Sequence, residues 1–226
     1  MKTDSIEYPW PDRRPHDLMC PQGGVCLHMD ALESMRSELE TLRTQVHTDA
    51  LTGLYNYRHF KKALDMEMER ARRSGKPVAL LMMDLDRFKT FNDTWGHAFG
   101  NKTLSHVARL IQTTVRRLDI PCRYGGEEFA VILPDTTLHA AITLADRLCG
   151  IIAGTPLYSE DTEVNVTTSI GVDVHAAGDR DYDEGFVRRT DAWLLQAKAG
   201  GRNRVCHPAE VSATHVSTDE RDLLLG

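Results

Sequence analysis

The amino-acid sequence predicts an α+β fold, in which helices cover a mixed β-sheet. Residues Val78 to Met83 form a continuous apolar run of strand length, as expected for a central strand that is covered on both faces. Gly125-Gly126 separates two short apolar segments, a pattern typical of a β-hairpin. Longer segments carry apolar residues at helical spacing, as Leu104, Val107 and Ala108 do. Together these three patterns favour a sheet with helices packed against it.

The predicted elements alternate between helix and strand along the chain. Ser74-Gly75-Lys76-Pro77 ends the first helix of the domain, and Gly200-Gly201 ends the last. We expect helices over residues 56–73, 101–118, 138–152 and 184–199, strands over 78–84 and 164–175, and a hairpin with strands at 121–124 and 128–133.

Composition and charge exclude several classes of protein. The 226 residues suffice for one domain with extensions. A net charge of −6 argues against a broad surface for nucleic acid or an anionic membrane, and the longest apolar run is too short to span a bilayer. Nothing at the N-terminus is typical of a signal peptide, and five irregularly spaced cysteines do not form a disulfide framework. We therefore expect a cytoplasmic protein without membrane insertion or a nucleic-acid partner.

The N-terminal part of the chain divides at about residue 29. Residues 1–28 contain four prolines and look irregular, whereas residues 29–48 carry apolar side chains spaced alternately three and four apart. This spacing predicts a self-pairing coiled-coil helix, with an ordinary amphipathic helix as the alternative. We expect the folded domain over 49–206 and a loose tail over 207–226.

A small group of potential metal ligands lies before this helix. His16, Cys20, Cys26 and His28 are of the residue types that bind zinc. Their spacing matches no standard zinc finger, so we expect unliganded side chains, and a zinc site is the alternative.

Carboxylates cluster around the predicted central strand and hairpin. Asp84 ends the strand, and Glu127 and Glu128 follow the two glycines of the hairpin. If the hairpin lies beside the strand, these carboxylates converge into a hard-oxygen site suited to Mg²⁺ held partly by substrate phosphates. Lys198 and Arg202 near a helix C-terminus would neutralise phosphates, although basic residues also favour that position through the helix dipole. A charged turn is the alternative for the two glutamates.

Several motifs together resemble the GGDEF family, the diguanylate cyclases, over residues 49 to about 205. The glycine hairpin is one of seven matching segments, all in family order and at family spacing. These segments are Asp49–Asn56, Asp84–Asp93, Gly96-His97 with Gly100, Arg123-Tyr124, Gly125–Phe129, Thr168–Val172, and Ala197-Lys198 with Gly201–Asn203.

The resemblance implies a palm-like sheet flanked by helices, similar to class III nucleotidyl cyclases, with an N-terminal helical stalk. It implies the condensation of two GTP into cyclic di-GMP and two pyrophosphates. Each active site would bind one GTP and two Mg²⁺ or Mn²⁺ ions, so two protomers must face each other. We expect residues 29–48 to hold this homodimer, or a higher homo-oligomer, and a separate protein to control activity by binding the stalk.

The family's functional residues carry over to matching positions here. Asp84, Glu127 and Glu128 resemble the catalytic metal-binding carboxylates, with a further ligand from the Leu85 carbonyl, and Glu127 is also a candidate base. The positions that match substrate-binding residues are Phe88, Lys89, Asn92, His97, Asn101, Gly125, Gly126, Lys198 and Arg202.

Asn101 departs from the family pattern, which usually has an aspartate after this glycine. An amide offers one acceptor and two donors, so guanine recognition would weaken if a donor stayed unpaired. The bolder interpretation is relaxed purine selectivity. We favour the plainer one, in which the amide accepts one bond and water supplies the rest.

Arg116 and Asp119 lie just before the hairpin and resemble the RxxD site at which cyclic di-GMP inhibits the family's enzymes. Arginine suits bidentate binding of phosphate, and aspartate accepts from guanine N–H groups. Arg70 and Arg147 are candidates to complete the site. A basic helix end with a capping aspartate is the structural alternative. An active cyclase is the first hypothesis, and a cyclic di-GMP receptor or scaffold without catalysis is the competing one.

Overall fold

The computed structural model describes residues 34–37, 47–160, 162–176, 179 and 183–209. It divides into two units, Met1–Thr44 and Gln45–Gly226, and each is treated by itself. Within the first unit, residues 34–37 are helical. The rest of the expected stalk up to residue 46 and the possible zinc ligands His16, Cys20, Cys26 and His28 lie outside the described residues.

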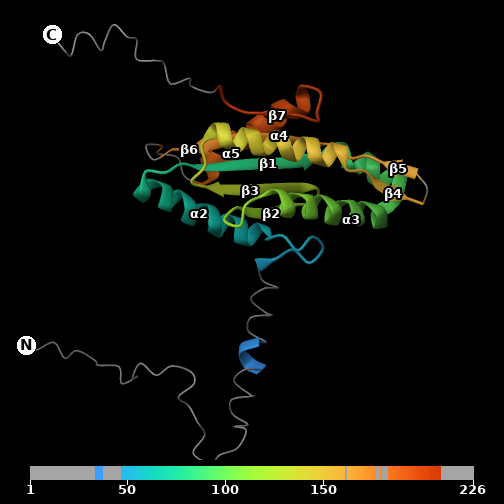
Figure 1. The fold of residues 1–226 in the computed structure, drawn as a ribbon, viewed down its shortest axis with the longest axis horizontal. Coiled ribbons are helices and arrows are strands. Elements are labelled where there is room, and N and C mark those ends of the chain that lie inside the picture. The colour runs from blue at the N-terminus through green and yellow to red at the C-terminus, as the bar shows by residue number, and fades with distance from the viewer. Residues whose placement is uncertain (1–33, 38–46, 161, 177–178, 180–182, 210–226) are drawn as a thin grey trace, which may run out of the picture. The chain divides into compact units, whose positions relative to one another are not determined.

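A five-stranded sheet forms the centre of the second unit, in the order β2-β3-β1-β6-β7 (Figure 1). Strand β1 (Val78–Leu85) lies in the middle and pairs antiparallel with β3 (Glu128–Pro134) on one side and with β6 (Thr168–His175) on the other. At one edge β2 (Ile120–Gly125) pairs antiparallel with β3, and at the other edge the short β7 (Val205–Cys206) runs parallel to β6.

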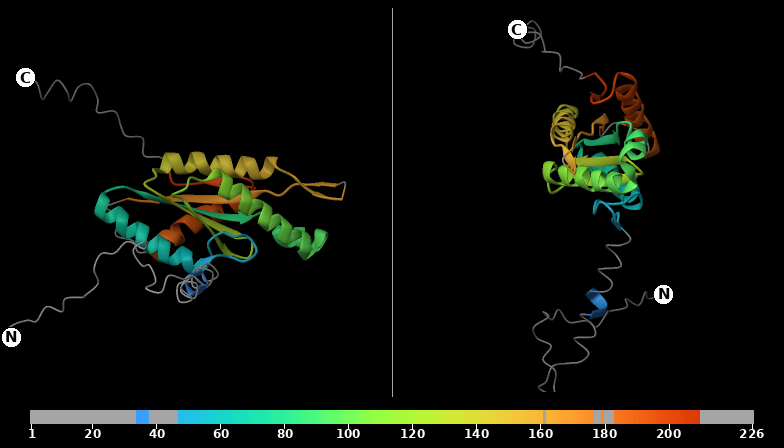
Figure 2. Two further views of the ribbon diagram at one scale, coloured as in Figure 1. Left: turned by 60° about the horizontal axis from the view of Figure 1, so that its bottom comes forward. Right: turned by 90° about the vertical axis from the view of Figure 1, so that its right-hand side faces the viewer.

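Helices cover both faces of this sheet (Figure 2). Helices α3 (Phe88–Thr114) and α4 (Leu138–Gly154) supply buried apolar residues to one core cluster. Helices α2 (Tyr57–Ser74) and α5 (Asp183–Ala199) supply the second cluster. The predicted mixed sheet flanked by helices is therefore confirmed.

Strand β1 separates the two cores because its side chains alternate between the faces. Ala79, Leu81 and Met83 pack into the cluster with α3 and α4. Val78, Leu80 and Met82 pack into the cluster with α2 and α5. Every residue from Val78 to Met83 is buried, as predicted from the unbroken apolar run.

One residue at each end of α2 sets where the helix begins and ends. The side chain of Asn56 caps the helix by accepting a hydrogen bond from the His59 N–H at 3.1 Å. Gly75 ends it in the left-handed conformation, at a φ of 75°, which only glycine adopts without strain.

Two predictions about the elements were wrong. The helix expected over 101–118 is part of the longer α3, which begins at Phe88, bends at Gly96 and ends at Thr114. The single strand expected over 164–175 is broken, because β5 (Thr162–Val164) pairs with β4 (Leu157–Ser159) and β6 starts only at Thr168. The left panel of Figure 2 shows this small hairpin continuing beyond the end of α4.

Among the residues that the structure describes, no helix combines the length and the apolar character needed to cross a membrane.

Gly171 of β6 provides a test of how closely the sheet and α5 pack. A Cβ atom at this position would lie 2.3 Å from both the Leu194 nitrogen and the Thr190 oxygen, which are backbone atoms of α5. We expect Gly171→Ala to lower the free energy of unfolding by about 3 kcal/mol, since helix and strand must move apart. Urea unfolding followed by circular dichroism measures this.

Gly150→Ala is the matched control for that measurement. Gly150 lies in α4 with nothing within 4 Å of an added Cβ, so we expect a gain of up to about 1 kcal/mol from helix propensity. Equal unfolding midpoints for the two variants would contradict the close approach of β6 and α5.

Candidate active site

The register of the sheet places two carboxylates side by side at the end of β1. Asp84 is the direct partner of Glu128 in the pairing of β1 with β3. One residue further along β1, the Leu85 backbone N–H donates a hydrogen bond to the Glu127 carbonyl at 3.3 Å. Of the four residues predicted as metal ligands, Asp84 and Leu85 thus end β1, Glu128 begins β3, and Glu127 lies in the turn just before it.

A two-residue turn at Gly126 and Glu127 connects β2 to β3. Gly126 has a φ of 34°, in the left-handed region that favours glycine. A Cβ on Gly125 would lie 3.5 Å from a carboxylate oxygen of Glu128, which is an ordinary contact. The backbone of the turn therefore favours glycine at position 126, whereas the space at position 125 does not exclude a small side chain.

A basic side chain, Lys198, contacts the first of these carboxylates directly. The Lys198 ammonium lies 2.8 Å from the Asp84 carboxylate, and the side chains are 29% and 14% exposed. Burial, followed by the negative charge of Asp84, raises the pKa of Glu128, and the charge of Lys198 opposes this rise. The strand end therefore gathers negative charge that Lys198 offsets in part.

The residues present fit a hard divalent cation, although they do not enclose one. Among the described residues, no three His, Cys, Asp or Glu side chains gather closely enough to hold a metal ion. Asp84 and Glu128 nevertheless supply adjacent carboxylate oxygens, which are the ligands that Mg²⁺ prefers. Such an ion keeps open positions for water or for substrate phosphates, so a two-carboxylate site is chemically sufficient when a phosphate completes it.

The predicted phosphate-binding residues lie on segments that adjoin the end of β1. Phe88 and Lys89 begin α3, where unpaired backbone N–H groups favour an anion. Arg87 precedes them in a left-handed conformation with a φ of 53°, which turns the chain sharply from strand to helix. Arg202 and Asn203 are also left-handed, at 65° and 44°. These strained residues require neighbouring contacts that hold them in place.

Asp86 supplies such a contact to Asn203, a role that the sequence analysis missed. Its carboxylate accepts hydrogen bonds from the Thr167 hydroxyl at 2.7 Å, the Ser169 hydroxyl at 2.6 Å and the Asn203 backbone N–H at 3.0 Å. The Asp86 N–H in turn donates to the Thr167 carbonyl at 2.9 Å. Asp86 therefore fixes the loop that carries Arg202 to the same strand end that carries Asp84.

The residues expected to read guanine lie on either side of the bend in α3. Asn92 precedes Gly96, and Asn101 follows it. The side-chain oxygen of Asn92 is buried and has no hydrogen-bond partner among the described residues. A Cβ on Gly100 would lie 1.9 Å from this oxygen, so glycine leaves the room that Asn92 occupies. The side chains of His97 and Asn101 are exposed.

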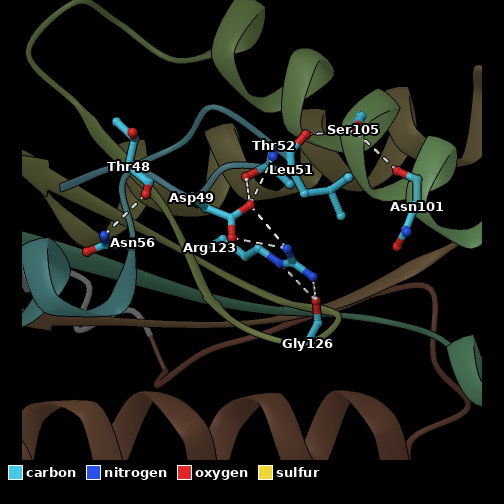
Figure 3. Close-up of polar contacts among 9 residues, drawn as sticks. All are labelled: Thr48, Asp49, Leu51, Thr52, Asn56, Asn101, Ser105, Arg123 and Gly126. Atoms are coloured by element: carbon cyan, nitrogen blue, oxygen red, sulfur yellow. Dashed lines mark hydrogen bonds and ion pairs between the residues drawn. The ribbon is translucent and has the colours of Figure 1, made fainter. Parts of the chain in front are cut away.

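A second network, shown in Figure 3, connects the hairpin turn to the start of the domain. The Arg123 guanidinium donates to both carboxylate oxygens of Asp49 at 3.1 Å and to the Gly126 carbonyl at 3.0 and 2.8 Å. Asp49 also accepts from the Thr52 N–H at 2.9 Å and from its hydroxyl at 2.7 Å. Burial by itself would raise the pKa of Asp49, but these hydrogen bonds and the charge of Arg123 together lower it.

The neighbouring helix α3 joins this network through a hydroxyl group. The Ser105 side chain donates to the Leu51 carbonyl at 3.0 Å and to the Asn101 carbonyl at 3.1 Å (Figure 3). The sequence analysis quoted Asp49 and Arg123 as parts of motifs without a role. Their separation of 74 residues gives no local signal of the pairing.

The RxxD residues form a capped turn after α3, as the structural alternative requires. The Asp119 carboxylate accepts from the Arg116 backbone N–H at 2.7 Å, and burial raises the pKa of Asp119. Arg147 donates to the Thr114 carbonyl at 2.6 Å and lines the same hollow of about 100 Å³ as Arg116 and Asp119. Arg70 lies elsewhere, beside Glu67 at 3.1 Å in a separate groove. The structure thus brings Arg147, and not Arg70, to this hollow.

The fold and the acidic strand end define a palm-like α+β domain with a glycine hairpin at its edge. This chain belongs to the GGDEF family, since residues 46–204 match the family model described as "Diguanylate cyclase, GGDEF domain". The resemblance stated from the sequence is therefore confirmed.

Curated relatives carry the names of signalling proteins. The response regulator PleD of Caulobacter vibrioides is 43% identical over 173 residues, which cover 76% of this chain and 38% of PleD. The diguanylate cyclase DgcM of Escherichia coli is 38% identical over 186 residues, which cover 80% of this chain and 43% of DgcM. The chain thus spans less than half the length of these two relatives.

Solved structures share the fold. The coiled coil and GGDEF domain of DgcB from Caulobacter crescentus, in complex with c-di-GMP, gives a TM-score of 0.74 at 32% identity, covering 80% of this chain and 95% of that one. Diguanylate cyclase SiaD from Pseudomonas aeruginosa, in complex with its activator SiaC, gives 0.71 at 35% identity, covering 80% of this chain and 69% of that one.

The Asp49–Arg123 pair provides a test of the network around the hairpin turn. Arg123→Lys keeps the charge, but a lysine cannot bind Asp49 and the Gly126 carbonyl through one planar group. We expect the free energy of unfolding to fall by about 2 kcal/mol at neutral pH. Arg73→Lys, in an exposed pair with Glu69, is the control and should change it by less than about 0.5 kcal/mol.

The pH dependence of this loss gives a second measurement. The pKa of Asp49 is lower in the folded protein than its usual 3.8, so its stabilising contribution is complete above that value. It is lost as the pH falls through the folded pKa. The difference between wild type and Arg123→Lys should therefore shrink in strong acid, and a constant difference would contradict the ion pair.

Proposed function

We propose that this protein is a diguanylate cyclase that condenses two GTP into cyclic di-GMP and two diphosphates. The observation that carries the proposal is the placement of Asp84 opposite Glu128, with Lys198 in contact and the glycine turn intact. Membership of the GGDEF family and relatives named as diguanylate cyclases support it. A catalytically inactive receptor would not need this set of charged groups to be complete.

The acidic residues would hold two Mg²⁺ or Mn²⁺ ions in each active site. Asp84, Glu127 and Glu128 supply carboxylates, and Leu85 supplies its carbonyl. The bound ions would favour ionisation of the attacking 3′-hydroxyl and stabilise the negative charge that develops on the diphosphate. The hydroxyl oxygen of each GTP forms a bond to the α-phosphorus of the other, and the bond from that phosphorus to the diphosphate breaks.

The basic and amide groups would hold the nucleotide. Lys89, Lys198 and Arg202, together with the Phe88 N–H, bind the triphosphate, and Gly125 and Gly126 let it approach the backbone. The buried Asn92 oxygen, which has no partner among the described residues, is suited to accept a hydrogen bond from guanine. His97 and Asn101 border the same base. We propose that Asn101 keeps guanine selectivity by accepting one of these bonds.

Catalysis requires a second copy of the chain, because each site binds one GTP and the product joins two. We propose a homodimer held through residues 29–48 and regulated by a protein that binds this stalk. The DgcB structure that includes a coiled coil and the SiaD complex with its activator SiaC support this arrangement.

The reaction itself is the first test of this proposal. Purified protein incubated with GTP and Mg²⁺ should release cyclic di-GMP and two diphosphates for each product molecule, measured by chromatography and a phosphate assay. Asp84→Asn should lower kcat by about 10²- to 10³-fold, because it removes a carboxylate ligand of the ions that stabilise the developing negative charge. Removal of the metal with EDTA should abolish turnover.

Asp135→Asn is the matched control for the loss of a carboxylate. Asp135 lies in an exposed ion pair with Lys76, and its left-handed φ of 50° suits asparagine equally well. This variant should keep the wild-type rate. Binding of cyclic di-GMP without any turnover, in the presence of candidate activators, would favour the receptor instead.

We further propose that the product inhibits the enzyme at Arg116, Asp119 and Arg147. Arg116→Ala should abolish inhibition by cyclic di-GMP while leaving the initial rate unchanged. The variant tests ligand binding rather than folding, because the Arg116 contact with Asp119 uses the backbone N–H, which alanine retains.

The adjacent Arg117 provides the control for this experiment. It is exposed like Arg116, so Arg117→Ala removes the same charge one residue away. Progress curves with added product should show inhibition in wild type and Arg117→Ala, and none in Arg116→Ala. Equal inhibition in all three would overturn the role of the RxxD residues.

A further inference from the structure

We propose that Lys198 blocks the carboxylates of Asp84 and Glu128 in the nucleotide-free protein, so that the divalent cation enters the site only together with GTP. On binding, the ammonium group moves from the Asp84 carboxylate to the triphosphate. The inference rests on the proposed function of this site and adds an order to the loading of its ligands.

The geometry of the ion pair supports a direct block. The Lys198 nitrogen lies 2.8 Å from Oδ2 of Asp84, which is hydrogen-bonding distance for a charged pair. Asp84 lies directly opposite Glu128 in the sheet, and the charge of Lys198 also acts on the Glu128 carboxylate. With Asp84 only 14% exposed, water screens this attraction less than it screens a surface pair. A cation that binds Asp84 from solution must first displace this group.

The site offers a bare cation too few ligands to offset that displacement. No group of three acidic, histidine or cysteine side chains able to hold a metal occurs within the described residues. Mg²⁺ also gives up its water reluctantly and binds through one or two carboxylates when phosphates complete its shell. Two carboxylates that are already paired with an ammonium group are therefore a weak site by themselves.

A triphosphate changes this balance in two ways at once. It supplies oxygen ligands that complete the shell of the cation, and it supplies a new anion for the displaced ammonium. Lys198 lies in the last turn of α5, one residue before the end of the helix. Its flexible stem and compact charge allow this exchange, whereas the planar guanidinium of an arginine would favour a fixed bidentate pair with the carboxylate.

Metal binding without turnover tests the exchange. Mn²⁺ is titrated into nucleotide-free full-length protein, and free Mn²⁺ is measured by electron paramagnetic resonance. We expect Lys198→Met to bind Mn²⁺ at least about tenfold more tightly than wild type. A neighbouring positive charge typically lowers the pKa of a carboxylate by one unit or more, which weakens its affinity for a proton about tenfold, and we expect a similar effect on a metal cation. A GTP analogue with a methylene group between the α- and β-phosphorus should tighten Mn²⁺ binding in wild type and less so in this variant.

Two further variants separate a specific block from a general loss of positive charge. Lys198→Arg keeps the pair with Asp84, so its Mn²⁺ affinity should stay at or below that of wild type. Arg202→Met removes a nearby positive charge from a residue with no described pair to Asp84, and should tighten binding less than about twofold in physiological salt. Lys198→Gln repeats the main measurement if the methionine variant is poorly folded by circular dichroism.

The outcomes distinguish this inference from the proposed function. If Lys198→Met and Lys198→Gln bind Mn²⁺ no more tightly than wild type, the exchange is wrong, although wild type that makes cyclic di-GMP would still be a cyclase. If wild type binds neither Mn²⁺ with the analogue nor GTP productively, both the exchange and the proposed function are overturned.

Discussion

The pairing of β1 with β3 is the constraint on which the site depends, because it places Asp84 opposite Glu128. Successive residues of a strand point to opposite faces, so a slip of one residue would separate the two carboxylates and turn the apolar side chains of β1 around. Met83 and Phe129, one step back along the same pair of strands, are both fully buried. The burial of the core thus fixes the register, and the register brings the charges together.

Charges placed together in this way need opposite charges, and the structure supplies them from distant parts of the chain. Lys198 comes from α5 to contact Asp84, and Arg123 comes from β2 to join Asp49 to the hairpin turn. The Asp86 carboxylate holds the loop of Arg202 by accepting a hydrogen bond from the Asn203 backbone N–H. Each of these contacts joins two segments far apart in sequence, and together they place the glycine turn, the strand end and the basic loop relative to one another.

The sequence predicted the elements whose signals are local and missed those that depend on distant partners. The run Val78–Met83 predicted a doubly buried strand, and Gly125-Gly126 predicted the hairpin, correctly in both cases. Residues 88–100 were missed as helix because Gly96, with its non-helical φ of 79°, interrupts the periodicity. The predicted metal ligands came together because strand and hairpin are adjacent, which a motif can indicate. The partners of Asp86 lie 81 to 117 residues away and the Asp49 partner of Arg123 lies 74 residues away, so they leave no such pattern.

The segment of residues 47–56, which leads into the domain, is bound to the edge of the hairpin. Tyr55 forms bridges to Thr48 and to Cys122 of β2, and the Arg123 N–H donates to the Tyr55 carbonyl at 2.7 Å. With the Asp49–Arg123 pair, these contacts continue directly to the turn at Gly126. Rotation of this segment against the hairpin would break the ion pair and the bridges together, and an unpaired charge or N–H group in a partly buried place is costly. Movement of this segment is therefore expected to carry the hairpin turn with it rather than to change the contacts between the two.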